Sequence, residues 1–231
     1  MCSCRNGSMA FVPNRTQTVS KDRTGETGGK EAFAAPSLVR VGGVMIAFAE
    51  DLFEYNGHQE RLFGTCYSDV VSGYIKAAET WPSIVAEITK EEWRAHAVLS
   101  SRNGDCRLRV FHRPTPIARD NKVFLLVGIY DEKYDNDDEE WATGDSGIQL
   151  VVGVATQSGD GGPSGMISWG ESKLFLQLIP THTQGHLKEF VTAGGSGIVM
   201  QNDTLVFPLR ARNEKNQPFS MITYSTDKGN N

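Results

Sequence analysis

Two stretches of this 231-residue sequence concentrate charged side chains that could bind an ion or a charged ligand. Arginines gather between Arg107 and Arg119, where they alternate with Val110, Phe111 and Ile117, and acidic residues gather between Asp131 and Glu140. Alternation with period two is typical of a strand with one solvated face, so we interpret the basic cluster as such a face. The acidic run is interpreted as a solvated loop. The net charge of −5 argues against a nucleic-acid-binding surface.

The sequence contains four cysteines. Cys2 and Cys4 lie in a polar N-terminal stretch, and Cys66 and Cys106 lie in the part expected to fold. The latter two would form a disulfide in a secreted protein, or they are two separate small buried residues. No Cys-x-x-Cys plus His spacing suggests a zinc site, and we expect no metal or organic cofactor.

Near the C-terminal end, Ser225-x-Asp227-x-Gly229 combines residue types that stabilise a tight turn. Ser and Asp side chains bind N–H groups of a turn, and Gly adopts the left-handed conformation. A degenerate copy spans Tyr74 to Trp81, which keeps Glu79-Thr80-Trp81 but has lost the Ser, Asp and Gly. Two strand-plus-turn units of this kind suggest a radial architecture built from repeats.

The turn pattern resembles the Asp box of sialidases, which lies on the outer hairpin of propeller blades. Longer runs carry the resemblance further: PSLVRVGGVMIAFAE, SDVVSGYIKAAETWPSIVAEI, KVFLLVGIYDE, IQLVVGVATQS, GHLKEFVTAGGSGIVM and NDTLVFPLRARN. These runs resemble trans-sialidase-like surface glycoproteins and stand in the order found in that family. The resemblance covers residues 32–231, which is nearly all of the chain expected to fold.

The resemblance implies a particular chemistry. Enzymes of the family hold the carboxylate of sialic acid with three arginines, because planar guanidinium groups bind carboxylates bidentately. A Tyr activated by a Glu is the nucleophile, and an Asp serves as acid and base. The first arginine sits in a Phe-Arg-x-Pro setting, which here reads Phe33-Ala34-Ala35-Pro36. Ala34 therefore occupies the arginine position, and one part of the carboxylate clamp is missing.

The acid/base Asp is expected after the strand that ends at Glu50, where this sequence diverges from the family. By counting, His58 falls near that position, and Glu54 and Glu60 are alternative carboxylates. Leu52 stands where the loop of family enzymes carries a second arginine. We therefore predict no catalytic residue in this chain.

Three further positions match residues that line the glycan pocket of the family. Arg113 precedes Pro114-Thr115, where family enzymes have an Asp, and Arg210 replaces a pocket Gln. Trp141 matches an aromatic residue of the glycan cleft, or else it is a loop Trp that packs on the rim of a blade. Trp141, Arg113 and Arg210 are the predicted binding residues.

The elements that position these residues are predicted to be about ten to twelve short strands with almost no helix, since β-rich runs alternate with turn signals. The runs are Ser37–Val41, Val44–Ala49, Asp69–Ile75, Trp93–Leu99, Arg107–Phe111, Lys122–Tyr130, Ile148–Ala155, Ser196–Met200, Thr204–Leu209 and Phe219–Tyr224. Gly42-Gly43 is the predicted turn of a hairpin, and the segment Ser172–Ile179 is ambiguous.

Residues 1–30 are polar and predict a disordered tail. Residues 31–231 are predicted to form an incomplete sialidase β-propeller domain, about its first half, because a four-stranded blade needs about 40–50 residues. The expected fold is thus all-β, a partial six-bladed sialidase-type β-propeller with a disordered N-terminal tail. Because a half ring leaves sheet edges open, we expect a marginally stable or aggregation-prone chain.

No stretch reaches the roughly 18–20 apolar residues of a membrane span, and no signal peptide is recognised. The resemblance implies a protein of the cell surface or a secreted one, attached to a membrane only through an anchor not present in this chain. Its implied partners are sialylated glycans or host glycoproteins, and not nucleic acid.

Three functional hypotheses remain open. The chain is an inactive surface adhesin or decoy, an incomplete copy of an exo-α-sialidase or trans-sialidase, or a gene fragment without a function of its own. Ala34, Leu52 and Arg113 favour the first hypothesis.

Overall fold

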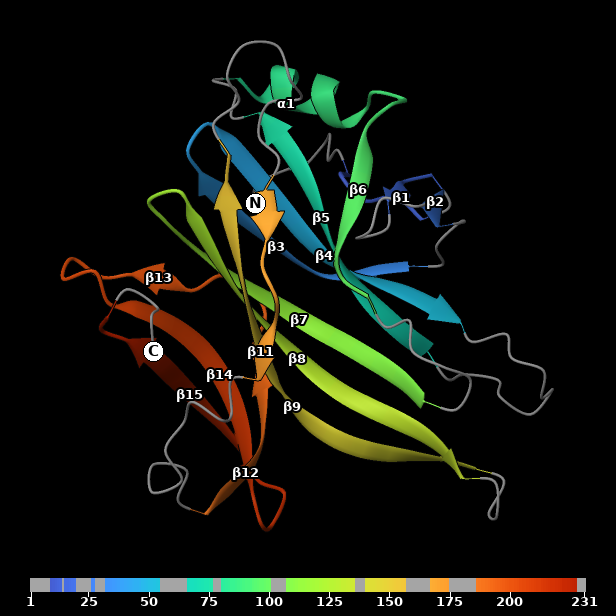
Figure 1. Ribbon diagram of the computed structural model, residues 1–231, viewed down its shortest axis with the longest axis vertical. Helices are drawn as coiled ribbons and strands as arrows, with labels where there is room; N and C mark the ends of the chain where they lie inside the picture. The colour runs from blue at the N-terminus through green and yellow to red at the C-terminus, as the bar shows by residue number, and fades with distance from the viewer. Residues whose placement is uncertain are drawn as a thin grey trace, which may run out of the picture.

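The computed structural model describes residues 9–13, 15–19, 26–27, 32–54, 66–76, 80–100, 107–135, 140–156, 167–174 and 186–227. These residues form antiparallel β units, which we call the first, second and third blades (Figure 1). Strands β7, β8 and β9 of the second blade cross the middle of the molecule, between the first blade and the third. The expected all-β class is confirmed.

The first blade is an antiparallel meander of four strands: β3 (Ala32–Val41), β4 (Val44–Glu54), β5 (Cys66–Lys76) and β6 (Arg94–Leu99). The predicted hairpin between β3 and β4 is confirmed. Gly42 has φ +56°, a conformation that a glycine adopts without steric cost.

The second blade contains β7 (Arg107–Arg119), β8 (Lys122–Asp135), β9 (Glu140–Ala155), β10 (Ile167–Trp169) and β11 (Lys173–Leu174). Both short strands pair with β9. A single parallel bridge, between Ser68 of β5 and Val110 of β7, joins this blade to the first, and the Ser68 hydroxyl donates to the carbonyl of Phe111.

The third blade contains β12 (Leu187–Thr192), β13 (Ile198–Val199), β14 (Leu205–Asn213) and β15 (Pro218–Ser225). Strand β14 is central, since the other three strands all pair with it in antiparallel orientation. Strands β13 and β14 lie within or overlap the predicted runs Ser196–Met200 and Thr204–Leu209, and they pair as a hairpin.

Part of the segment predicted as a disordered tail is ordered instead. Strand β1 (Gln17–Val19) pairs in parallel with the outer strand β6, and β2 (Glu26–Thr27) pairs with β1. The ring of Phe11 lies 5.3 Å from that of Phe33 and 5.9 Å from that of Trp93, measured between centroids. The prediction is wrong for these residues because the first blade offers them an apolar face and an open sheet edge.

A helix, α1 (Trp81–Ile88), begins where the degenerate copy of the turn motif was predicted. Thr80 precedes the helix in an extended conformation and Pro82 lies in its first turn, where a proline loses no helical hydrogen bond. Trp81 is exposed and starts the helix, so it does not close a turn over a blade. Trp81 therefore does not have the role that the second turn motif predicts for it, and residues 77–79 of that motif lie outside the described residues.

The acidic run Asp131–Glu140 is strand, and not the predicted loop, at both of its described ends. Strand β8 reaches Asp135 and β9 begins at Glu140, with Glu132 opposite Thr143 and Asp135 opposite Glu140. Asp131 is buried, and its carboxylate accepts a 2.8 Å bond from Arg109. Ladder pairing and this ion pair outweigh the preference of acidic residues for solvent.

Two apolar clusters separate the three blades. Strand β8 supplies both, because successive side chains of a strand point to opposite faces. Val123, Leu125 and Val127 face the first blade, and Phe124 and Leu126 face the third. All five are buried.

Hydrogen bonds near an irregular point of β7 tie the third blade to the second. The ladder between β7 and β8 shifts register between His112 and Thr115. There the Thr192 hydroxyl donates to the His112 carbonyl and accepts from the N–H of Gly128. The N–H of Gly197 donates to the carbonyl of Pro116 at 3.1 Å.

We predict that Gly197→Ala destabilises the chain by about 1–3 kcal/mol, the usual range for overpacking. A Cβ at this position would lie 2.6 Å from Ile117 and 2.6 Å from the carbonyl oxygen of Val206, so the second and third blades would be pushed apart. Urea unfolding followed by tryptophan fluorescence measures the effect. Gly43→Ala is the control, because nothing lies within 4 Å of its added Cβ. Equal midpoints for the two variants would contradict the packing described.

We also predict that His112 makes the fold less stable as the pH falls. Burial, with a smaller contribution from the charge of Arg113, lowers the pKa of His112 from 6.5 to about 4. Between these two values the unfolded chain binds a proton that the folded chain does not, so stability is lost as the pH drops from 6.5 to about 4. The loss approaches about 1.4 kcal/mol per pH unit.

His112→Phe tests this prediction, since it retains a ring over Gly128 and beside Tyr130 but cannot bind a proton. The difference in unfolding free energy between wild type and variant should change across this pH window and be constant above it. Parallel pH profiles of the two proteins would show that His112 is not the titrating group.

Candidate functional site

Position 34 lies on an irregular part of β3. The ladder between β3 and β4 shifts register between Ala34 and Ser37, and Ala35 has φ +45°. Ala34 lies opposite Glu50 of β4. A β-bulge redirects side chains locally, which is why bulges are common beside binding sites. Here the redirected position carries only a methyl group.

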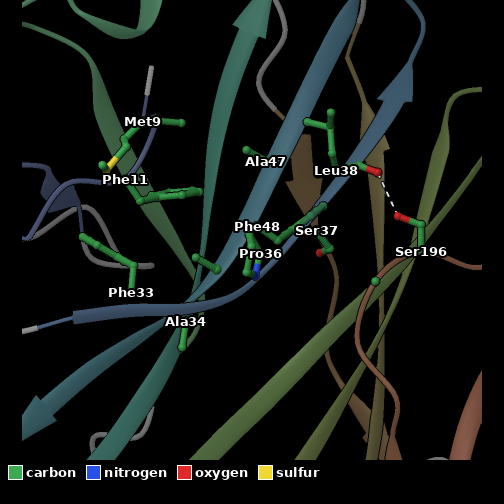
Figure 2. A pocket seen from close by; sticks show the side chains of 13 residues that line it. Met9, Phe11, Phe33, Ala34, Pro36, Ser37, Leu38, Ala47, Phe48 and Ser196 are labelled. Atoms are coloured by element: carbon green, nitrogen blue, oxygen red, sulfur yellow. Dashed lines mark hydrogen bonds between the residues drawn. The ribbon is translucent and has the colours of Figure 1, made fainter. Parts of the chain in front are cut away.

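A cavity of about 530 Å³ lies beside Ala34 (Figure 2). Its walls come from the N-terminal segment, β3, β4 and the connection between β12 and β13; the lining residues are Met9, Ala10, Phe11, Phe33, Ala34, Pro36, Ser37, Leu38, Ala47, Phe48, Ala49, Gly195 and Ser196. None of them is charged. The cavity thus offers apolar contact to a ligand, and its described walls hold no cation for a carboxylate.

Two serine hydroxyls are the side-chain polar groups of this cavity. The Ser196 hydroxyl donates to the carbonyl of Leu38 at 2.9 Å, which joins the third blade to the first (Figure 2). Ser37 is buried, and its hydroxyl has no hydrogen-bond partner within the described ranges.

Arg113 occupies the second bulge, in the innermost part of β7. It has φ +51°, which is uncommon for a residue with a side chain. The Thr115 hydroxyl donates to the Arg113 carbonyl at 3.1 Å and accepts from the N–H of Gly194 at 3.1 Å. A Cβ on Gly194 would lie 3.7 Å from the Arg113 Cβ, so the third blade packs directly against this residue.

Glu50 is a site residue that sequence reasoning missed. Its carboxylate accepts a 2.5 Å hydrogen bond from the backbone N–H of Arg113, across the boundary between the first and second blades. Burial raises the pKa of Glu50 above its ordinary value, although the N–H and the charge of Arg113 act against the shift. One signal was present in the sequence. Ile46, Phe48 and Glu50 lie on one face of β4 because they are two residues apart, so the alternation predicts that the Glu50 carboxylate faces the same way as two buried apolar side chains.

Arg113 is partly buried as a residue, and its guanidinium has no hydrogen bond or ion pair with any residue that the structure describes. Neighbouring arginines of the same strand differ, since Arg109 pairs with Asp131 and Arg119 pairs with Asp203 at 3.0 Å. The charge of Arg113 acts on both Glu50 and His112, which places it near both groups. Arg113 is therefore a cation available to an anionic ligand.

Arg210, also predicted as a binding residue, lies on another face. Its neighbours on β14, Leu209 and Ala211, are buried in the cluster between the second and third blades. Arg210 is exposed and points away from that cluster, following the alternation of a strand. No contact described here joins it to Arg113.

The other predicted positions are placed only in part. Trp141 lies opposite Tyr134 near the start of β9, and its side chain is outside the described residues. Leu52 lies on β4 opposite Ala32. His58 and Glu60 are outside the described residues, as is Cys106, so the Cys66–Cys106 alternatives remain open.

The turn motif begins at Ser225, the last residue of β15. The Ser225 hydroxyl donates to the Asp227 carboxylate at 2.6 Å, a contact between two side chains, whereas the sequence predicts bonds from these side chains to N–H groups of the turn. Gly229 is outside the described residues.

Within the described ranges, no group of three or more His, Cys, Asp or Glu side chains is arranged to bind a metal ion. No helix in the same ranges has the length and apolar character needed to cross a membrane.

A family model described as a BNR repeat-like domain matches residues 35–231. Among curated relatives, "Sialidase 85-1.1" of Trypanosoma cruzi is 42% identical over 222 residues, which cover 95% of this chain and 29% of the relative. A sialidase of Paraclostridium sordellii is 26% identical over 236 residues, which cover 97% of this chain and 52% of that relative. This chain thus spans well under two thirds of these relatives.

The fold matches solved sialidases. Trypanosoma rangeli sialidase superposes with a TM-score of 0.71 and 25% identity, over 96% of this chain and 33% of that one. The same enzyme in complex with sialic acid gives a TM-score of 0.70 at 24% identity, with the same coverage. The blades described above are therefore part of a sialidase β-propeller, and the chain belongs to the sialidase and trans-sialidase superfamily of BNR-repeat proteins.

Proposed function

We propose that this part of the propeller binds sialylated glycans or glycoproteins and does not cleave sialic acid. Two observations support the proposal: the cavity at Ala34 is lined by uncharged residues, and Arg113, which is not among them, has a guanidinium without an ion pair in the described part of the chain. The resemblance to family enzymes implies a guanidinium at position 34, which alanine cannot replace.

An apolar cavity and one guanidinium suit recognition better than catalysis. A single arginine beside a carboxylate ligand forms a charge-assisted hydrogen bond, which supports binding. Catalysis needs stronger contacts in the transition state than in the ground state, and these demand several groups held in fixed positions. The proposed role is therefore adhesion or display as a decoy, and an incomplete sialidase or a fragment without function are the competing outcomes of the tests below.

We predict that the 231-residue chain binds 3′-sialyllactose and leaves lactose unbound, because the anionic sugar interacts with Arg113. Arg113→Ala should weaken binding at least about tenfold, which corresponds to about 1.4 kcal/mol. Isothermal titration or ligand-observed NMR measures the affinity. Arg40→Ala is the matched control, since Arg40 is an exposed arginine of β3 that does not line the cavity, and the change should leave affinity unchanged.

Turnover of 4-methylumbelliferyl sialic acid by the same preparation should stay at the buffer rate. Clear release of the fluorophore would overturn the non-cleaving part of the proposal. Equal weakening by Arg40→Ala and Arg113→Ala would show that binding reflects overall charge and not this site. A chain that is folded by circular dichroism and binds neither sugar would favour the fragment hypothesis.

A further inference from the structure

We propose that Glu50 is a positioning residue, which holds Arg113 in its left-handed bulge and so directs the guanidinium to an anionic ligand. The inference rests on the proposed function, because the ligand in question is the sialylated glycan. It adds a residue from the first blade to a site whose cation comes from the second.

The starting point is the backbone of Arg113. Its φ of +51° lies in a region that side-chain-bearing residues seldom adopt, so neighbouring groups must maintain it. In this conformation the ladder between β7 and β8 is interrupted, from His112 to Thr115. The N–H of Arg113 points out of the second blade and needs an acceptor elsewhere.

Glu50 supplies that acceptor from the neighbouring blade. Its Oε1 atom accepts the hydrogen bond from the Arg113 N–H. A carboxylate is a strong acceptor for a backbone N–H, because the bond is assisted by charge. On the other side, the Thr115 hydroxyl donates to the Arg113 carbonyl and accepts a hydrogen bond from the N–H of Gly194 in the third blade. Groups from all three blades thus determine one conformation.

Glu50 is itself held in place by two strands. It lies on β4 opposite Ala34 of β3 and opposite Val70 of β5. A cation at position 34 would compete for this carboxylate, because directly opposed side chains on adjacent strands interact. The methyl group of Ala34 does not compete, and the carboxylate remains available to Arg113.

The experiment distinguishes the role of Glu50 as a hydrogen-bond acceptor from the role of its negative charge. Glu50→Gln retains an acceptor oxygen, and Glu50→Leu removes it. We expect Glu50→Leu to weaken 3′-sialyllactose binding about tenfold or more and Glu50→Gln to change it less than about threefold, since hydrogen bonding does the positioning. Glu50→Asp moves the carboxylate oxygens away from the Arg113 N–H, so its affinity should lie between those of the Gln and Leu variants. It replaces Glu50→Leu in the comparison if that variant does not fold.

Glu87→Leu is the matched control. The Glu87 carboxylate also accepts a backbone N–H, that of Lys76 at 2.9 Å, but it lies on α1. Affinity should not change in this variant. In an Arg113→Ala background Glu50→Leu should have no further effect, because the two residues act through one contact. Additive losses in the double variant would overturn the proposal.

A second measurement does not need the glycan. The charge of Arg113 contributes to the low pKa of His112, so release of Arg113 should raise that pKa. NMR titration of the imidazole should show a higher pKa in Glu50→Leu than in Glu50→Gln. If wild type binds no sialyllactose but the His112 pKa rises, the proposed function fails and the role of Glu50 stands. If the His112 pKa is the same in folded Glu50→Leu as in Glu50→Gln, the proposed role of Glu50 is overturned.

Discussion

The hydrogen bond from the Arg113 N–H to the Glu50 carboxylate lies where the blades of this molecule meet. The bulge of β7 interrupts the ladder of the second blade and frees an N–H that the first blade accepts. The same bulge turns the carbonyls of His112 and Arg113 toward Thr192 and Thr115, which link it to the third blade. Hydrogen bonds are directional, so those at the bulge set the register between the sheets. Apolar packing, which is not directional, sets this register less well.

Apolar packing explains why the blades stack at all. Strand β8 is buried on both faces, and its alternate side chains enter two separate clusters. On the first blade, Phe11 packs against the cluster of Ala49, Val71 and Ala95, and β1 pairs with the edge strand β6. The N-terminal segment is ordered by these contacts with distant residues, which is why polar composition alone misjudged it.

The proposed function rests on the distribution of charge. At Ala34, where the resemblance implies a guanidinium, the residues lining the cavity are uncharged. At Arg113, where the resemblance implies a carboxylate, the residue is a cation whose backbone N–H donates to the Glu50 carboxylate. We propose that this distribution supports binding of an anion and not the concerted stabilisation that glycoside cleavage needs.

Period-two alternation and turn residues determined most strands from the sequence alone, because those signals are local. The runs around Pro36, Lys122 and Ser225 likewise indicated the superfamily, and with it the importance of positions 34 and 113. Tertiary structure decided the rest. The partner of the Arg113 N–H is 63 residues distant in sequence, and β1 pairs with a strand far along the chain. Strand pairing extends β8 and β9 into both ends of an acidic run that propensity assigned to a loop. Contacts between distant residues depend on which sheets pack together, and no short window of sequence contains that information.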